Sequence, residues 1–272
     1  MTIKVYKPTN PLVKNHIECF YILEQTSEEK PATYFTFPSI YTIVSISEQT
    51  KTLETENQIT IKPCKSNAIE TNLVSNFNEP VLVKYEGKIN EITTYFKPLG
   101  INGFINHDLR YYSEGTFPDF NPHDDYKDSM ASILSIENPD ERIRKLEDYW
   151  ISKWRPFEDL LLESVLTEMM DSSNLDLSLT NLSHKTGRSR TTINKHFDRH
   201  ICKTPSQLKK IIRFRKAIQS HLENEINLSY SLDYFDQSHM IRDFRKLTGF
   251  TPKAFFSKIA LLENGQIKWI FV

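Results

Sequence analysis

The hydrophobic pattern of this chain changes its period near residue 100, and that change limits the folds open to it. Short runs rich in β-branched and aromatic residues come first and predict strands at 34–37, 41–46, 59–61, 81–85 and 91–96. Residues 100–124 are loop-like, with Gly115, Pro118 and Pro122 as breakers. From about Asp128, apolar residues, Leu160 among them, recur every three or four positions, as they do along amphipathic helices. Asn138 and Pro139 predict the start of one of these helices. We therefore predict an α+β chain in which a β-rich, antiparallel sandwich or barrel-like part is followed by helices.

Breaks in this pattern divide the chain into three predicted segments. Residues 1–124 form the β-rich domain, and residues 125–172 form a helical linker. The polar run 171–174 marks the boundary of an all-α domain over 173–272. The amphipathic stretch 139–170 is a candidate dimer interface, and packing of the same stretch against the β-rich domain is the alternative.

Several classes of protein are disfavoured by the composition of the 272 residues. The chain holds only 7 Gly, which argues against Gly-rich phosphate loops. No apolar run approaches the ~20 residues that span a bilayer, and the first residues lack the apolar stretch of a secretory signal. Cys19, Cys64 and Cys202 are far apart and odd in number, which is typical of reduced thiols in a cytoplasmic protein.

Charge is distributed unevenly, although the net charge of the whole chain is only −1. Residues 177–216 carry eleven Lys or Arg and one acidic residue, a net of +10, whereas 217–258 carry five of each sign. The other 190 residues together carry a net of −11. Such asymmetry favours a polyanionic partner for the basic segment, and a solvated helical surface is the alternative.

The basic segment contains a helix, a turn and a second helix. Gly187 suits the left-handed residue that ends the first helix, and Ser189 can cap the second. In that second helix, Ile193 and Phe197 are four residues apart and should point into a core. The pattern predicts a helix-turn-helix, whose exposed second helix presents Arg, Asn, Thr and Lys. These side chains suit the major groove, since Arg donates to guanine and Asn pairs with adenine.

A second copy of the pattern strengthens this interpretation. Phe197 is followed after eight residues by Pro205, and Phe244 is followed after eight residues by Pro252. An amphipathic helix over roughly 206–222 joins the two copies. Two such units on one side of DNA would reach successive major grooves, about one helical turn or ~34 Å apart.

Residues 177–258 resemble the AraC-type (AraC/XylS) family of bacterial transcription regulators. The residues that carry the resemblance are Gly187, Ser189, Ile193, Phe197, Thr204-Pro205, Arg213, Arg215-Lys216-Ala217, Asp236-Gln237-Ser238-His239, Arg242-Asp243-Phe244 and Gly249-Phe250-Thr251-Pro252. The β-rich part resembles the N-terminal domain of that family more weakly, through Phe96-Lys97-Pro98-Leu99-Gly100.

The resemblance implies a cytoplasmic, sequence-specific DNA-binding protein that activates or represses transcription. It implies no enzymatic activity, no cofactor and no bound metal. Double-stranded DNA is the implied partner, together with RNA polymerase. In many members of the family the N-terminal domain binds a small-molecule effector or forms a homodimer.

Residue by residue, the resemblance assigns two kinds of DNA contact. Base contacts are expected from Arg190, Thr191, Asn194, Lys195, Gln237, Ser238, His239 and Arg242. Phosphate contacts are expected from Lys185, Ser189, Lys209, Lys210 and Arg245. For any one of the first group, a phosphate contact or a solvated side chain is the alternative, because half or more of protein–DNA hydrogen bonds go to the backbone.

The sequence departs from the family at a few positions. Cys202 and Asp233 stand where the family usually has Gly, and Ser183 and Ser229 stand where it usually has Ala. The connection from 217 to 229 is about three residues shorter than the family's usual spacing. The first unit, which also holds the excess positive charge, is therefore expected to be the stronger DNA reader.

Other functions are weighed against this one. A DNA-repair enzyme with the same module needs a Pro-Cys-His-Arg setting and a four-Cys zinc site, which three Cys without those neighbours do not provide. An interaction scaffold with a degenerate second unit is the third candidate.

Two groups of side chains have a bland and a functional interpretation. His196, His200 and Cys202 could bind a metal, but packing of their helix is the favoured interpretation. A second set of possible ligands is favoured to be a solvated loop: His107, Asp108, His123, Asp124 and Asp125. The aromatics that could line a ligand pocket or fill the sandwich core are Tyr34, Phe35, Phe37, Tyr41, Tyr95 and Phe96.

Overall fold

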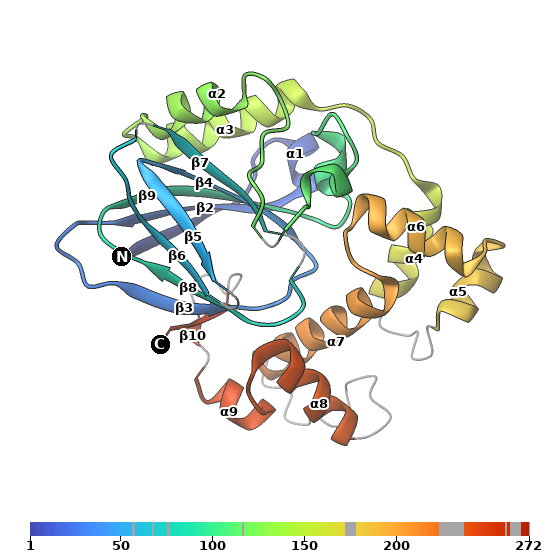
Figure 1. Cartoon of the computed structure of the whole chain (residues 1–272). Coiled ribbons are helices and arrows are strands. Elements are labelled where there is room, and N and C mark those ends of the chain that lie inside the picture. The colour runs from blue at the N-terminus through green and yellow to red at the C-terminus, as the bar shows by residue number, and fades with distance from the viewer. Residues whose placement is uncertain are drawn as a thin grey trace.

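The computed structural model describes residues 1–55, 58–66, 68–74, 77–115, 117–171, 178–222, 237–258, 260–261 and 268–271. A two-sheet sandwich forms one side of the molecule and helices form the other (Figure 1). The predicted α+β class is therefore confirmed, with a β-rich N-terminal part and a helical C-terminal part.

The strands are β1 Thr2–Tyr6, β2 Ile17–Gln25, β3 Ala32–Thr36, β4 Thr42–Glu48, β5 Thr50–Thr55, β6 Gln58–Pro63, β7 Ile69–Val74, β8 Val81–Tyr85, β9 Ile89–Phe96, β10 Ala260–Leu261 and β11 Lys268–Phe271. The helices are α1 Pro11–His16, α2 Tyr126–Leu134, α3 Pro139–Lys153, α4 Leu160–Met170, α5 Leu179–Thr186, α6 Arg190–His200, α7 Pro205–Leu222, α8 Gln237–Thr248 and α9 Pro252–Phe256. Two 3-10 helices, η1 Gly100–Gly103 and η2 Leu109–Tyr112, lie in the segment predicted as loop.

One sheet has the order β1-β2-β9-β4-β7 and the other the order β10-β11-β3-β8-β6-β5. Neighbouring strands pair in antiparallel fashion, as predicted, with one exception: β6 and β8 are parallel, with Ile59 opposite Val83. The chain between them passes through β7, which belongs to the other sheet, and such a crossover is what a parallel pair requires.

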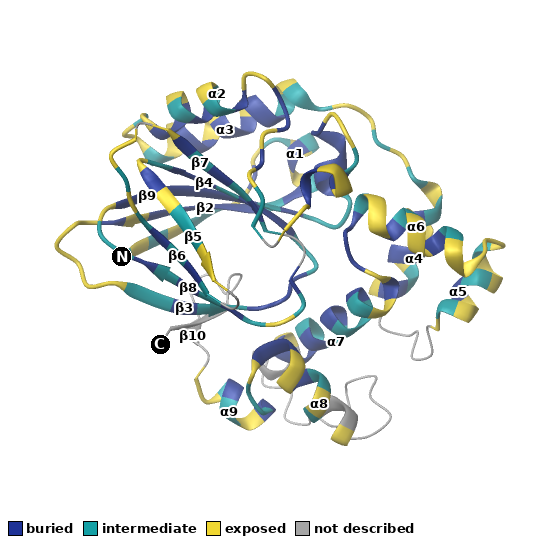
Figure 2. Ribbon diagram, in the orientation of Figure 1, coloured by how far each residue is buried: buried dark blue, intermediate teal, exposed yellow. Residues whose placement is uncertain are grey.

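Helices α2 and α3 cover the first sheet and share a core with it (Figures 1 and 2). Asn138 caps α3 by accepting a hydrogen bond from the Glu141 amide at 3.0 Å, and Pro139 occupies the first turn, as predicted. Trp150 of α3 is fully buried, with its ring 5.1 Å from that of Phe96 at the end of β9. Part of the apolar stripe in 139–170 is therefore used inside the chain.

The segment after β9 turns sharply because of one close backbone approach. A Cβ placed on Gly100 would lie 2.1 Å from the His16 carbonyl oxygen, so only glycine fits. Leu99, just before it, has a left-handed φ of 62°, and the Lys97 amide donates to the same His16 carbonyl at 2.8 Å. The Pro98-Leu99-Gly100 signature thus fastens the end of β9 to the end of α1.

The β-rich and helical parts are in direct contact. Phe37, between β3 and β4, packs its ring 5.2 Å from Phe255 and 6.4 Å from Phe214. Arg215 of α7 donates to the carbonyl oxygens of Phe37 and Pro38 at 3.3 and 3.2 Å. In addition, β11 pairs with β3, so the C-terminal end of the chain extends an N-terminal sheet (Figure 1).

Candidate DNA-binding surface

The first helix-turn-helix unit is built from local capping signals. Ser178 accepts from the Asn181 amide at 3.1 Å and begins α5. Gly187 ends it with a left-handed φ of 65°, and Ser189 begins α6 by accepting from the Thr192 amide at 3.1 Å. The predicted roles of Gly187 and Ser189 as turn residue and cap are confirmed.

An apolar core holds the two helices of this unit together. Leu182 of α5 is 2% exposed, and Ile193 and Phe197 of α6 are fully buried. They pack with Leu162 and Val165 of α4 in one cluster. Leu160, predicted to belong to the apolar stripe of that helix, is instead 76% exposed. Asp159 caps the helix through the Leu162 amide, which places Leu160 in the first turn and away from the core.

The outer side of α6 presents the four predicted base-contacting side chains of this unit. Arg190, Thr191, Asn194 and Lys195 are all exposed. Because 190 and 194, and 191 and 195, are one helical turn apart, the four share one side of the helix. That side carries two cations and one amide, the groups that donate to base edges.

In the second unit, the described part begins at α8. Ser238, Arg242 and Arg245 are exposed on this helix, and Phe244 is fully buried. The side chains of Gln237 and His239, and the whole segment 223–236 with Ser229, Asp233 and Asp236, lie outside the described residues.

Each of the helices α6 and α8 is followed by a turn with a left-handed residue. After α6 it is Cys202, with φ 57°, and after α8 it is Gly249, with φ 76°. Cys202 therefore occupies the left-handed conformation expected from the family's usual glycine. Thr204 and Thr251 then cap the following helices by accepting from the amides of Gln207 and Ala254.

A protein-family model described as a helix-turn-helix domain matches residues 182–258, which include this geometry. Residues 182–258 are an AraC-type helix-turn-helix domain. Domains of this type bind DNA and serve in transcription regulation. The match covers less than a third of the chain, and no curated protein sequence matches the chain.

Among solved structures, the chain is similar to ToxT from Vibrio cholerae. One crystal structure of ToxT has a TM-score of 0.45 and 10% identity, over 94% of this chain and 98% of that chain. Wild-type ToxT bound to an unsaturated fatty acid has a TM-score of 0.42 and 12% identity, over 87% of this chain and 94% of that chain.

Part of the positive charge in the AraC-type domain serves the fold. Lys203 is only 5% exposed, and burial lowers the pKa of its ammonium group to about 8. Three other cations form ion pairs: Lys185 with Glu168 at 2.6 Å, Lys210 with Asp243 at 3.4 Å and Arg199 with Asp108 at 3.2 Å. Arg188, Arg190 and Lys195 are exposed around the turn and on α6. Sequence alone did not separate these roles, because a lysine in a turn has the same local pattern whether buried or exposed.

The histidines of α6 contact other parts of the chain. His196 Nδ1 lies 2.6 Å from Asp159 Oδ2, and His200 Nδ1 lies 3.1 Å from Asn102 Oδ1. In the described part of the chain, no group of three or more His, Cys, Asp or Glu side chains is placed to hold a metal ion. Burial raises the pKa of the Cys202 thiol, and raises that of Cys19 to about 12, which disfavours reactive thiolates at either position.

The aromatic side chains of the β-rich part divide between cores and one cavity. Tyr34 and Tyr95 line a cavity between the two sheets, whereas Phe35 and Phe37 pack toward the AraC-type domain and Phe96 belongs to the core under α3. None of the described helices is both long and apolar enough to cross a membrane.

Proposed function

We propose that this protein is a sequence-specific regulator of transcription that reads DNA with α6 and α8 in successive major grooves. The single observation that carries the proposal is the row of exposed Arg190, Thr191, Asn194 and Lys195 on a capped, well-packed α6. Base edges are reached by Arg190, Thr191, Asn194 and Lys195 in the first unit, and by Gln237, Ser238, His239 and Arg242 in the second.

Phosphate contacts surround these positions in the same proposal. Lys185, Ser189, Lys209, Lys210 and Arg245 lie on or next to the helices of the two units. The ion pairs of Lys185 and Lys210 with carboxylates would open, or be shared, when phosphate arrives. Such contacts add affinity without sequence information and make binding fall with salt.

The test is selection of bound sequences from a random DNA pool, followed by fluorescence anisotropy on the selected site over a salt series. Selective binding with a steep salt dependence supports the proposal. If no sequence is enriched and all duplexes bind alike, the proposal is wrong and a scaffold role takes its place.

Two substitutions sharpen that test. Asn194→Ala should relax selectivity at one or two base pairs by about 1–3 kcal/mol, whereas Lys209→Ala should weaken binding to all sequences alike and lower the salt slope by about one. Lys145→Ala on α3 is a matched control, since it removes an exposed cation outside the AraC-type domain. Equal effects of Asn194→Ala on every sequence would contradict its base contact.

The proposal also assigns a role to each segment of the chain and names its partners. The β-rich residues 1–124 would receive an effector, residues 125–172 would connect, and 173–272 would bind DNA in the cytoplasm, where RNA polymerase is the target. A homodimer is supported by Leu160 and Met170, which are 76% and 45% exposed at the two ends of α4. A molecular mass equal to that of one chain, measured by light scattering, would exclude the homodimer.

A further inference from the structure

A cavity of about 60 Å³ lies inside the sandwich, away from the DNA-binding surface. Its walls come from both sheets, with Tyr21 and Glu91 on β2 and β9 and Tyr34 and Tyr85 on β3 and β8. A single water needs roughly 10–15 Å³ by this kind of measure, so the cavity has room for several waters or one small ligand.

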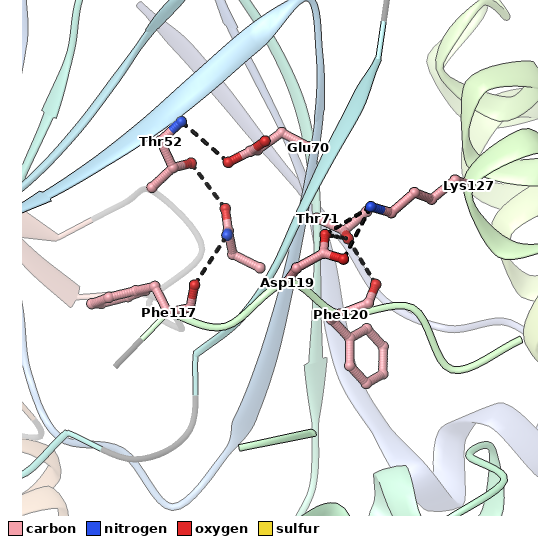
Figure 3. A network of polar contacts seen from close by, with 8 residues as sticks. Thr52, Glu70, Thr71, Phe117, Asp119, Phe120 and Lys127 are labelled. Atoms are coloured by element: carbon pink, nitrogen blue, oxygen red, sulfur yellow. Dashed lines mark hydrogen bonds and ion pairs between the residues drawn. The ribbon is translucent and has the colours of Figure 1, made fainter. Parts of the chain in front are cut away.

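One wall of the cavity is an irregular segment instead of a strand. Phe117 lines the cavity, and its segment lies along β7, where the Leu73 amide donates to the Pro118 carbonyl at 3.0 Å. The Asn72 side chain donates to the Phe117 carbonyl at 3.3 Å and accepts from the Thr52 hydroxyl at 3.0 Å. Figure 3 shows the two contacts of the Asn72 side chain, together with those of Asp119 to Thr71 and Lys127. The wall is thus held in place by side chains.

The polar centre of the cavity is the carboxyl group of Glu91, which is 1% exposed. It accepts hydrogen bonds from the hydroxyls of Tyr21 at 3.1 Å, Tyr85 at 3.0 Å and Thr93 at 3.0 Å. Neutral hydroxyls are the donors, and none of the residues described as lining the cavity is basic. A buried carboxylate without a positive partner is costly, so this one is suited to a cation that arrives from outside.

Aromatic rings surround that carboxyl group. The rings of Tyr34 and Tyr85 are stacked at 6.0 Å, and those of Tyr21 and Tyr95 lie 5.9 Å apart. The faces of such rings carry negative charge density and attract ammonium groups, most strongly where water is excluded. Half of the remaining lining is aliphatic, from Ile43, Ile59, Ile61, Val74 and Val83, and the other half is Thr36, Ser45, Thr52, Asn72 and Phe117. Carboxylate, ring faces and aliphatic wall together match a small molecule with one cationic and one apolar end.

We propose that the cavity binds a small protonated amine, with Glu91 as its counter-ion and the tyrosine rings around its ammonium group. An anionic ligand would be repelled by Glu91, and a neutral alcohol would leave the charge of the carboxylate without a counter-ion. This inference deepens the proposed function, since it gives the chemical class of the effector that the β-rich part would sense.

The cavity is connected to the AraC-type domain by a short path. Tyr34 lines the cavity from β3, and three residues later Phe37 packs against Phe214 and Phe255. Tyr95, from β9, has its ring 6.0 Å from Tyr41, close to the segment that Arg215 contacts. A ligand that shifts these strand ends would therefore act on the helices that follow α6.

The experiment is isothermal titration of the full chain with three matched probes: n-propylamine, n-propanol and propionate. For a ligand of four heavy atoms, affinity limits allow a Kd of about 1 mM or tighter. We expect saturable binding of the amine, and binding of the alcohol and the carboxylate that is at least tenfold weaker. No amine binding, or equal binding of the three probes, would overturn the proposal.

Substitutions in the cavity test whether the amine binds there. Glu91→Gln keeps the shape of the side chain and should weaken amine binding at least tenfold. Glu54→Gln on β5, an exposed carboxylate that does not line the cavity, is the matched control and should leave amine binding unchanged. If Glu91→Gln does not fold, Tyr95→Leu removes a ring instead and should weaken the amine by a similar factor. Retained affinity in a folded Glu91→Gln or Tyr95→Leu variant would contradict the site.

DNA binding is measured on the same samples without amine, so that the two proposals can fail separately. Amine binding without selective DNA binding would remove the proposed function and leave the ligand site. Selective DNA binding without amine binding would do the reverse.

Discussion

The two helix-turn-helix units end in the same kind of turn, but the turns are made of different residues. After α6 the left-handed residue is Cys202, which is buried, and after α8 it is Gly249, which is exposed. A side chain in this conformation costs roughly 1–2 kcal/mol, and glycine avoids that cost. The first turn therefore needs compensation that the second does not.

The compensation comes from the β-rich part. The Cys202 thiol lies 3.2 Å from the Ser113 hydroxyl, and Cys202 belongs to the core under α3. The His200 carbonyl accepts from the Asn102 side chain at 2.9 Å. A residue keeps a strained backbone conformation only where surrounding contacts hold it there. The first turn is therefore also a contact between the AraC-type domain and the β-rich part. The second unit contacts the β-rich part through apolar rings instead, those of Phe35 and Phe37.

The largest expected effect should be the same in both units. Phe197 and Phe244 occupy equivalent positions and are both fully buried, so replacement by Ala leaves a cavity at each. We expect Phe197→Ala and Phe244→Ala each to lower the free energy of unfolding by about 3–5 kcal/mol, measured by urea denaturation. The exposed Thr191→Ala is the control and should stay within about 0.5 kcal/mol. A loss below that control level at either Phe would show that its unit is not packed as described.

The next effect belongs to the first turn alone. Lys203 is buried and the pKa of its ammonium group is lowered to about 8, whereas an unfolded lysine titrates near 10.4. Below pH 8 the native state therefore holds a poorly solvated charge. We expect Lys203→Met to raise the free energy of unfolding by about 1–3 kcal/mol at pH 7.

The stability difference between the wild type and Lys203→Met should depend on pH in a defined direction. Between about pH 8 and pH 10 the unfolded wild-type chain binds more protons at this lysine than the native chain, so its stability rises with pH. The Met variant lacks this rise, and the gap between the two proteins should close over that window. Comparing the two proteins cancels the titration of the Cys and Tyr groups that do not interact with Lys203, whereas Cys202 does interact with it. A gap that stays constant from pH 7 to pH 10 would contradict a buried ammonium group.

The sequence predicts what local signals determine. Gly187, Ser189 and the Asn138-Pro139 start act within one helical turn of themselves, and each is found as predicted. Strands β3, β4, β6, β8 and β9 are predicted from their β-branched and aromatic runs. Strands β5, with the sequence TKTLET, and β7, with the sequence IETNLV, were missed because polar residues interrupt their apolar pattern. The parallel β6–β8 pair and the pairing of β11 with β3 depend on residues far apart in the chain, and no local pattern encodes them.

The candidate site divides in the same way. The exposure of Arg190, Thr191, Asn194 and Lys195 follows from the helical period once Ile193 and Phe197 face the core. Their contacts with DNA stay a prediction. Burial of Lys203 could not be predicted, because it depends on how the turn after α6 meets the β-rich part. The Glu91 cluster was also missed, since its members come from four strands and have no common spacing.

A smaller effect tests the left-handed residues directly. A Cβ on Gly249 would meet Pro80 Cγ at 3.7 Å, an ordinary contact, so space does not oppose a side chain there. Gly249→Ala should therefore lower the free energy of unfolding by about 1–2 kcal/mol for backbone reasons alone. In the matched variant Cys202→Gly, relief of the backbone should offset the lost burial of the thiol, with a net change below about 1 kcal/mol. If Gly249→Ala leaves the free energy of unfolding in urea unchanged, its turn has opened.

The smallest effect concerns the caps that follow the two turns. Thr204 and Gln207 form a reciprocal pair, in which the Gln207 amide donates to the Thr204 hydroxyl at 3.2 Å and the Thr204 amide donates to Gln207 Oε1 at 2.7 Å. In the second turn, Thr251 accepts from the Ala254 amide at 3.3 Å, and alanine has no side-chain acceptor to return the bond.

Removing the side-chain acceptor from the first cap and adding one to the second should therefore change the free energy of unfolding in opposite directions. Gln207→Ala is expected to lower the free energy of unfolding by about 0.5 kcal/mol, and Ala254→Gln to raise it by a similar amount. For a chain of this size each change corresponds to a shift in melting temperature of about 1–2 °C, which differential scanning calorimetry resolves. Ala254 is half-buried, so the longer side chain must fit beside α8. A lower melting temperature for Ala254→Gln would show that this space is closed and that the second cap is simple because its surroundings require it.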